Sequence, residues 1–197
     1  MAPHTLREIA GLPTQPTALR DAALVLIDCQ NTYREGIMRL AGVEEAVAEA
    51  SRLLRRARDA GIPVIHIQHD SGVGSPYDTT ARIGRISDEV APVVGESVIT
   101  KHYPNSFIET DLEQQLRAAG KTDLVLAGFM THMCVNSTAR GAFNLGFRPT
   151  VVAAATATRD LPGSGGEVVT AAALQAASLA GLGDLFAVIV PSSRDLA

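Results

Sequence analysis

Cys134 is one of two cysteines in the chain, and it lies where a predicted buried strand gives way to a predicted helix. The apolar run TDLVLAG precedes it, and small apolar residues at helical spacing follow it. Thr131 is of a type that caps helices, which would place Cys134 in the first helical turn. Unpaired N–H groups and the helix dipole at that position lower a thiol pKa and can stabilise an oxyanion. The position indicates a nucleophile, although burial as a small core residue is the commoner fate of a lone cysteine.

Two charged residues close other predicted strands. Asp28 ends the apolar run AALVLID, and Lys101 follows the run SVIT. A carboxylate at such a place either caps nearby backbone or belongs to a site, and a lysine is ordinarily solvated. Because ligands of parallel α/β sheets bind beyond the carboxyl ends of the strands, both positions favour a site. Cys29 points to the opposite face of its strand from Asp28, so we expect a core thiol rather than a partner for Cys134.

The histidines form no metal-binding pattern. His66 and His69 are three residues apart on one predicted strand, so they face opposite sides and make a poor metal pair. His69 ends that strand and could line a pocket, whereas His102 and His132 could each be a base for Cys134 or a pocket wall. No Cys/His cluster has the spacing of a zinc site. We expect no metal and no other cofactor.

Strand-like runs alternate with helical patterns along the whole chain. Several of the runs are continuously apolar, which suits strands that are buried on both faces. The alternation predicts an α/β fold in which helices cover both sides of a doubly wound, six-stranded parallel sheet, in three layers. The six predicted strands lie within residues 22–28, 62–68, 97–100, 122–128, 149–155 and 185–190.

The remaining segments predict a simple domain organisation. We expect an N-terminal arm over residues 1–20 and a single domain over residues 21–197. The irregular stretch 70–96 is long for a compact domain, and such loops are usually lids, binding loops or interface elements. An amphipathic helix is predicted where apolar residues recur at helical spacing and arginines fill the gaps, at Val47, Ala50, Leu54 and Ala57.

Composition excludes several classes of function. The 197 residues are 46% hydrophobic and carry a formal net charge of −4, so the chain lacks the basic footprint of a nucleic-acid-binding protein. No apolar run is long enough to span a membrane, and the N-terminus lacks the apolar core of a secretory signal. Two cysteines cannot build a disulfide scaffold, so we expect a reduced, cytoplasmic setting. The partner that we expect is a small-molecule substrate.

Three motifs together resemble the isochorismatase-like cysteine hydrolase family, which includes nicotinamidases, N-carbamoylsarcosine amidases and ureidoacrylate amidohydrolases. They are LIDCQNTY at the first strand, Lys101 before NSFIETDLEQQLRAAG, and GFMTHMCVNSTARGAFNLGF around the cysteine. The resemblance covers nearly the whole chain and implies the Rossmann-like fold of that family. It also implies that Asp28, Lys101 and Cys134 form a catalytic triad.

The resemblance implies further features of the site. A cis peptide bond maps onto Phe129–Met130, and the backbone N–H groups of Met130 and Cys134 would form the oxyanion hole. The reaction would be hydrolysis of a small amide or carbamoyl C–N bond, other than a peptide bond, through a thioester. The family also points to a homodimer or higher homo-oligomer. Neighbours of the catalytic positions are the expected pocket walls, namely Tyr33, His69, Tyr103, Phe107 and His132.

The sequence departs from some branches of that family. Nicotinamidases carry an Asp-x-His…His metal motif after the second strand, and the corresponding HIQHDSGVGSPYD lacks it. Isochorismatases proper cleave a vinyl ether without a cysteine nucleophile, so Cys134 argues against that activity. A vinyl ether hydrolase and a non-catalytic binding or redox-sensing protein remain the alternatives.

Overall fold

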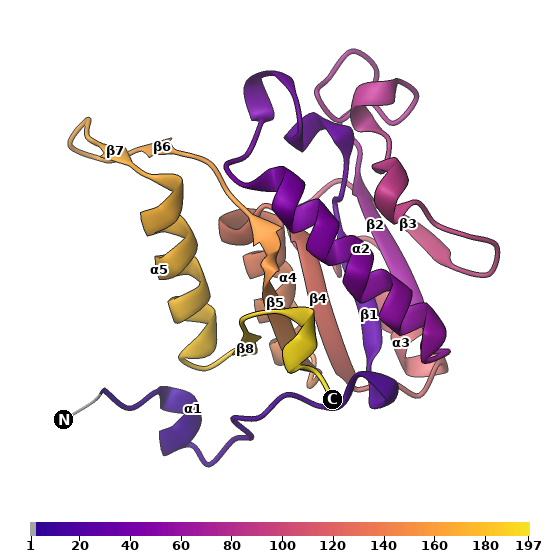
Figure 1. Ribbon diagram of the computed structural model, residues 1–197, viewed down its shortest axis with the longest axis vertical. Helices are drawn as coiled ribbons and strands as arrows, with labels where there is room; N and C mark the ends of the chain where they lie inside the picture. The colour runs from indigo at the N-terminus through magenta and orange to yellow at the C-terminus, as the bar shows by residue number, and fades with distance from the viewer. Residues whose placement is uncertain (1–2) are drawn as a thin grey trace.

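A six-stranded, all-parallel sheet forms the centre of the molecule (Figure 1). The computed structural model describes residues 3–197. The strands lie in the order β3-β2-β1-β4-β5-β8, which confirms the predicted sheet. Their bounds are β1 Ala23–Ile27, β2 Val64–His69, β3 Ser97–Lys101, β4 Asp123–Phe129, β5 Arg148–Ala157 and β8 Val188–Val190.

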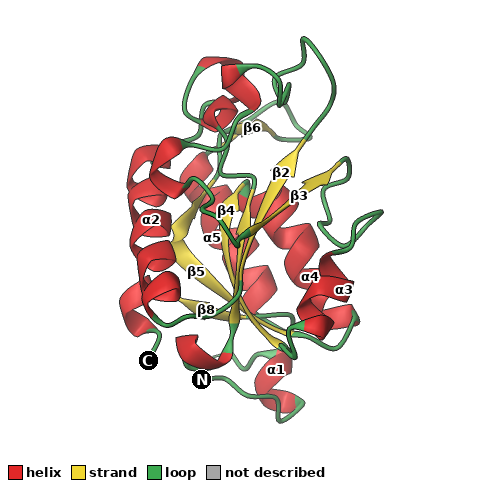
Figure 2. Ribbon diagram, turned by 90° about the vertical axis from the view of Figure 1, so that its right-hand side faces the viewer, coloured by secondary structure: helices red, strands yellow, loops and turns green. Residues whose placement is uncertain are grey.

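Helices cover both faces of this sheet, as the alternating pattern predicts. Figure 2 shows α2 on one side and α3 and α4 on the other. The four apolar positions that predicted α2 are all buried, and Gly42 precedes the helix with a left-handed φ of 67°. The helices are α1 Leu6–Ile9, α2 Val43–Asp59, α3 Leu112–Ala118, α4 Asn136–Asn144 and α5 Ala171–Gly183.

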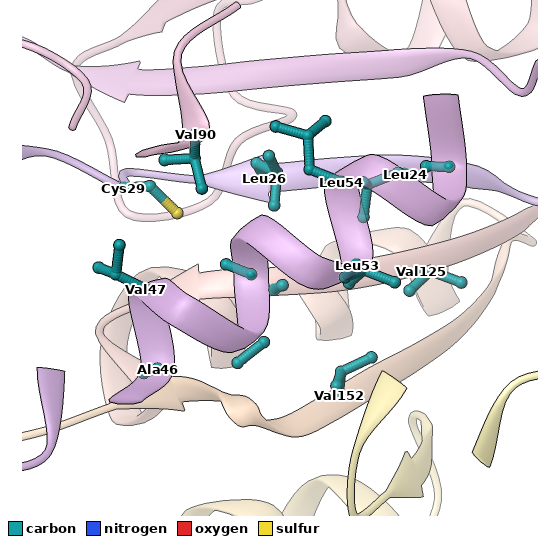
Figure 3. Packing of buried hydrophobic residues seen from close by; sticks show 14 of the residues in the cluster. Leu24, Leu26, Cys29, Ala46, Val47, Leu53, Leu54, Val90, Val125 and Val152 are labelled. Atoms are coloured by element: carbon teal, nitrogen blue, oxygen red, sulfur yellow. The ribbon is translucent and has the colours of Figure 1, made fainter. Parts of the chain in front are cut away.

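Each face of the sheet has its own hydrophobic core. One core lies between the sheet and α2, and Figure 3 shows its tight packing around Leu26, Leu54 and Val125. The other lies under α3, α4 and α5 and contains Cys134 at its edge. Cys29 is 2% exposed and belongs to the core beneath α2, which confirms the prediction that it is a core thiol.

The direction of winding reverses between β1 and β4. From β1 the chain builds β2 and β3 on one side, and from β4 it builds β5 and β8 on the other. Ligands of open α/β sheets bind at such a switch point, beyond the carboxyl ends of the strands. Gly128 allows β4 to approach β1 there: its φ is 120°, and a Cβ atom would lie 1.9 Å from the Ile27 carbonyl oxygen.

The long segment 70–96 folds against the carboxyl end of β1. Gln30 fastens it, because its Nε2 donates to the Gly84 carbonyl at 2.6 Å and to the His69 carbonyl at 2.9 Å. Ser87 N donates to the Cys29 carbonyl at 2.8 Å, and the Val90 side chain is fully buried in the core beneath α2. In Figure 1 this magenta segment lies beyond the carboxyl ends of the strands.

Two features were not predicted. The first is α1 in the N-terminal arm, where Arg7 N donates to the Asp184 carbonyl at 2.7 Å, so the described part of the arm packs on the end of α5 of its own chain. Residues 1–2 of the predicted arm lie outside the described residues. The second is a short antiparallel hairpin that projects from the body in Figure 1, formed by β6 Leu161–Pro162 and β7 Val168–Val169. Among residues 3–197, no helix has the length and apolarity needed to cross a membrane.

Candidate active site

The three residues of the predicted triad meet at the switch point. Asp28 follows β1, Lys101 ends β3, and Cys134 follows β4 by a short turn. The Lys101 Nζ lies 2.8 Å from Asp28 Oδ2 and 3.4 Å from Cys134 Sγ. Asp28 and Lys101 are fully buried, and Cys134 is 5% exposed. One buried ammonium therefore contacts a carboxylate and a thiol at once.

The Asp28 carboxylate is held in place by its backbone and its charge. Its φ is 50°, a left-handed value that is uncommon for residues other than glycine and is enriched at functional sites. Its backbone N–H donates to the Ile67 carbonyl at 2.9 Å. Within residues 3–197, neither carboxylate oxygen has an aligned hydrogen-bond donor. The carboxylate forms an ion pair with Lys101 and keeps lone pairs available for a proton.

The protonation of the site differs from the sequence-based expectation for the thiol. Burial, and then the negative charge of Asp28, raise the pKa of Cys134 to about 12, and Lys101 opposes this only in part. Burial also raises the pKa of Asp28. Two acidic groups share one cation in a buried site, so the pair retains one proton at neutral pH. The resting nucleophile is a thiol beside a carboxylate rather than a free thiolate.

The turn that carries Cys134 is also wider than predicted. Thr131 to Val135 form a single π-turn, in which Val135 N donates to the Met130 carbonyl at 3.2 Å, and α4 begins only at Asn136. Thr131 does not cap the helix: its hydroxyl is buried and has no partner among the described residues. Single π-turns within helices occur frequently at functional sites.

A backbone donor four residues before Cys134 in the sequence is unpaired among the described residues. The Phe129–Met130 peptide bond is cis, at the position that the family resemblance implies. In the described part of the chain, the Met130 N–H donates to no acceptor. Met130 is 5% exposed, so this N–H lies in a nearly solvent-free region. The arrangement leaves one amide available to a bound carbonyl oxygen.

His69 is the fourth polar group of the site. Its Nδ1 lies 3.2 Å from Lys101 Nζ, and its Nε2 lies 3.1 Å from Ser71 Oγ. Its backbone N–H donates to Gln30 Oε1 at 2.9 Å, which fixes the end of β2. Burial, and then the charge of Lys101, lower the pKa of His69 to about 4. The imidazole is therefore neutral at physiological pH.

Aromatic rings pack together close to Asp28 and Cys134. Tyr33 is 1% exposed, and its ring meets those of Tyr77 and Phe129 edge-on at 5.9 and 5.7 Å between centroids. The hydroxyls of Tyr33 and Tyr77 lie 3.3 Å apart. Burial and the charges of Asp28 and Cys134 raise the pKa of both tyrosines, so both stay neutral. Tyr77 is not predicted by any local sequence pattern, because only the fold of segment 70–96 brings it to the site.

The contacts of the other predicted pocket walls are as follows. Phe107 stacks on Phe147 at 5.7 Å in the core below α3 and α4, and the side chain of Tyr103 is at the surface, 43% exposed. His132 is half-buried, and its Nδ1 lies 2.6 Å from Thr158 Oγ1, at the end of β5.

The remaining candidate base also has another partner. His102 donates from Nδ1 to the Asp70 carbonyl at 2.8 Å and points to the surface. Over residues 3–197, no three His, Cys, Asp or Glu side chains come close enough together to bind a metal ion.

Comparison with known proteins assigns the family. Residues 22–192 match the isochorismatase domain. The chain belongs to the isochorismatase family. The secreted isochorismatase effector Isc1 of Verticillium dahliae is 37% identical over 193 residues, which is 98% of each chain. The crystal structure of an isochorismatase from Pseudomonas putida covers the whole of both chains with a TM-score of 0.95 and 38% identity.

The isochorismatase family also contains relatives named for C–N hydrolysis. Ureidoacrylate amidohydrolase RutB of Pseudomonas syringae is 31% identical over 191 residues, covering 77% of this chain and 78% of its own. The family resemblance drawn from the motifs is thus confirmed, and the protein is a hydrolase of this family. The Verticillium relative is named as secreted, so the cytoplasmic setting expected for this chain stays a prediction.

Proposed function

We propose that the protein hydrolyses a small amide or carbamoyl C–N bond with Cys134 as the nucleophile. The observation that carries this proposal is the contact of one buried ammonium, Lys101, with both Asp28 and Cys134. A buried carboxylate that accepts no aligned hydrogen bond, beside a protonated thiol, is an acid–base pair suited to activating that thiol. The named amidohydrolase among the relatives supports the same bond type.

The proposed acylation half begins with a proton transfer. Asp28 takes the thiol proton while Cys134 Sγ forms a bond to the carbonyl carbon, and the carbonyl π pair moves onto oxygen. The Met130 N–H supports this oxyanion, and the Cys134 N–H is the predicted second donor. Lys101 keeps the site near neutrality throughout, because the negative charge only moves from the carboxylate to the sulfur and then to the oxygen.

The second half returns the proton and releases the acid. As the C–N bond breaks, protonated Asp28 gives its proton to the leaving amine and a thioester remains on Cys134. Asp28 then removes a proton from water while the water oxygen bonds to the thioester carbon. The C–S bond breaks, the sulfur regains the proton from Asp28, and the cycle closes without any cofactor.

The surroundings favour a small substrate. Cys134 is only 5% exposed, and Tyr33 and Tyr77, which pack ring to ring, lie close enough to Asp28 and Cys134 to interact with them electrostatically. Outside this ring cluster, Arg159 lies two residues after the end of β5, and its Nε is buried without an acceptor among the described residues. A substrate screen should therefore include small amides and ureides both with and without a carboxylate.

The test is a screen for released ammonia or amine, with Cys134→Ala as the blank. Cys29→Ala is the matched control, because it removes the other thiol from the core beneath α2. We expect Cys134→Ala and Asp28→Asn to abolish turnover and Cys29→Ala to retain it. Acid quenching during turnover should trap an acyl group on the peptide that contains Cys134. Retention of a tenth of wild-type turnover by Cys134→Ala would exclude the covalent mechanism.

A vinyl ether hydrolase is the second candidate, because close relatives are named isochorismatase. Release of pyruvate rather than ammonia or amine, at a rate insensitive to Cys134→Ala, would establish it. A redox-sensing role fits the site less well. Oxidation requires a thiolate, and burial keeps the Cys134 thiol protonated.

A further inference from the structure

We propose that His69 is a positioning residue for the triad: its Nδ1 accepts an N–H of the Lys101 ammonium and so fixes that cation between Asp28 and Cys134. This inference rests on the proposed function only through the importance of Lys101. It assigns to His69 a role toward the enzyme's own cation instead of the role of pocket wall that its sequence position suggests.

The number of acceptors around Lys101 carries the inference. A lysine ammonium has three N–H donors and accepts nothing. Three acceptors from three different strand ends lie within reach of Nζ: Asp28 Oδ2 at 2.8 Å, His69 Nδ1 at 3.2 Å and Cys134 Sγ at 3.4 Å. Lys101 is fully buried, so water does not replace a missing acceptor. His69 Nδ1 and Cys134 Sγ lie at hydrogen-bonding geometry from Nζ, and Asp28 pairs with the ammonium by charge. Of these three neighbours, His69 is the one that is both uncharged and non-reacting.

The contacts also determine the tautomer of His69. Because the ammonium can only donate, Nδ1 must be the unprotonated nitrogen, and the proton of the neutral ring is on Nε2. Nε2–H then donates to Ser71 Oγ at 3.1 Å. The ring of Tyr77 packs edge-on against the imidazole, with 4.9 Å between centroids. Segment 70–96 thus holds the imidazole from the side opposite Lys101.

The backbone of His69 is fixed as firmly as its ring. Gln30 accepts from the His69 N–H with Oε1 and donates to the His69 carbonyl with Nε2, both at 2.9 Å. Gln30 is itself fully buried and follows Asp28 by two residues. The same short stretch of chain after β1 therefore sets both the carboxylate and the histidine that flank the ammonium.

A consequence concerns which group meets the substrate oxygen. Because Lys101 bonds to His69 and Cys134 and pairs with Asp28 at 2.8 Å, it can donate to a bound carbonyl only by weakening one of these contacts. The oxyanion is then left to backbone donors such as the Met130 N–H, which has no acceptor in residues 3–197. With His69 in place, Lys101 balances the charge of the site and backbone N–H groups stabilise the oxyanion.

The test reads the reactivity of Cys134 and needs no substrate. The rate of iodoacetamide modification of Cys134 is measured against pH by mass spectrometry, which separates it from Cys29. The variants are His69→Asn, which places an amide oxygen near the Nδ1 position, and His69→Gln and His69→Leu, which do not. His102→Asn is the matched control, because that histidine is next to Lys101 but points to the surface and bonds the Asp70 carbonyl.

We expect His69→Leu and His69→Gln to lower the alkylation rate at pH 8 at least tenfold and to shift the profile to higher pH. His69→Asn should stay within threefold of the wild type, and His102→Asn should be unchanged. The charged and titratable groups that face His69 are Lys101, His102, Asp70 and Tyr77, with Asp28 and Cys134 beyond the ammonium. Because the same set faces every His69 variant, differences among the variants report the acceptor itself.

Two outcomes would overturn the inference. One is a set of superimposable profiles for folded His69→Leu and wild type. If the leucine variant does not fold, the other outcome is that the asparagine and glutamine variants have the same pH profile of Cys134 alkylation. Lys101→Ala is the reference: if its profile also matches the wild type, then Lys101 does not influence Cys134 and the proposed mechanism fails as well. If no amide or carbamoyl compound is hydrolysed but the His69 variants show the expected alkylation profiles, only the proposed substrate class is rejected.

Discussion

Replacing Lys101 with methionine should destabilise the fold in a way that depends on pH. The Lys101–Asp28 pair is 2.8 Å apart and both side chains are fully buried. Removing one partner of such a pair leaves an uncompensated buried charge, at a cost of about 3–5 kcal/mol. A domain has about 5–15 kcal/mol of unfolding free energy, so the variant should fold but be marginally stable.

The pH dependence follows from Asp28. Burial already raises the pKa of Asp28, and Lys101 is the main group that opposes this, so the variant's carboxyl should have a still higher pKa. The folded state then holds a proton that the unfolded state releases above its ordinary pKa of about 3.9. Stability is therefore greatest below that value and falls as pH rises toward the folded-state pKa, by at most about 1.4 kcal/mol per pH unit.

The measurement is urea unfolding at several pH values between about 5 and 8. Asp28→Asn/Lys101→Met is the control, since it has neither charge and should lose the added pH dependence. The two single variants and the double variant form a cycle, and we expect a coupling energy at the upper end of about 0.5–3 kcal/mol. If Lys101→Met lowers the unfolding free energy by less than about 1 kcal/mol and keeps the wild-type pH dependence, the buried ion pair is refuted, because exposed ion pairs contribute that little.

Three further predictions follow from other parts of the molecule. Gly128→Ala should cost more than about 4 kcal/mol in a thermal or urea unfolding experiment, because its Cβ would lie 1.9 Å from the Ile27 carbonyl oxygen. Gly61→Ala, which has a φ of 63° but no atom within 4 Å of its Cβ, should cost only about 1–2 kcal/mol, and equal losses would disprove the close-approach argument. Turnover should survive dialysis against a chelator, since the sequence lacks the nicotinamidase metal motif; a loss that zinc, iron or manganese restores would show otherwise. Light scattering at micromolar concentration should give at least a dimer, because the alanine-rich α5 leaves many of its residues exposed and the β6–β7 hairpin projects from the body, and a monomer mass would contradict this.

The triad could be located from the sequence because each member lies at the end of an apolar run. Parallel strands bring their carboxyl ends to one edge of the sheet, so a local pattern is enough to group Asp28, Lys101 and Cys134. The core position of Cys29 followed from strand alternation in the same way. The reasoning needed only the period of a strand and the type of the residue that ends it.

The rest of the site depends on the path of loops, which has no period. Tyr77 reaches the triad only because segment 70–96 folds back over β1, and no local pattern marks it. Phe107 follows Lys101 by six residues, yet the turn between them sends it into the core. The pKa of Cys134 could not be predicted either, because position near a helix start lowers it while burial beside Asp28 raises it, and burial is a property of the whole fold.

The position of β3 at the edge of the sheet has a consequence for how the enzyme loses activity in denaturant. β3 pairs only with β2 and carries Lys101 as its last residue, whereas Asp28 and Cys134 follow β1 and β4 in the centre of the sheet. Edge elements open locally at lower free energy than central ones. Detachment of β3 would withdraw the cation while the nucleophile and its base stay folded. Activity should therefore be lost at a lower denaturant concentration than the one that unfolds the sheet. Hydrogen exchange of the β3 amides should become fast over the same range of denaturant concentration.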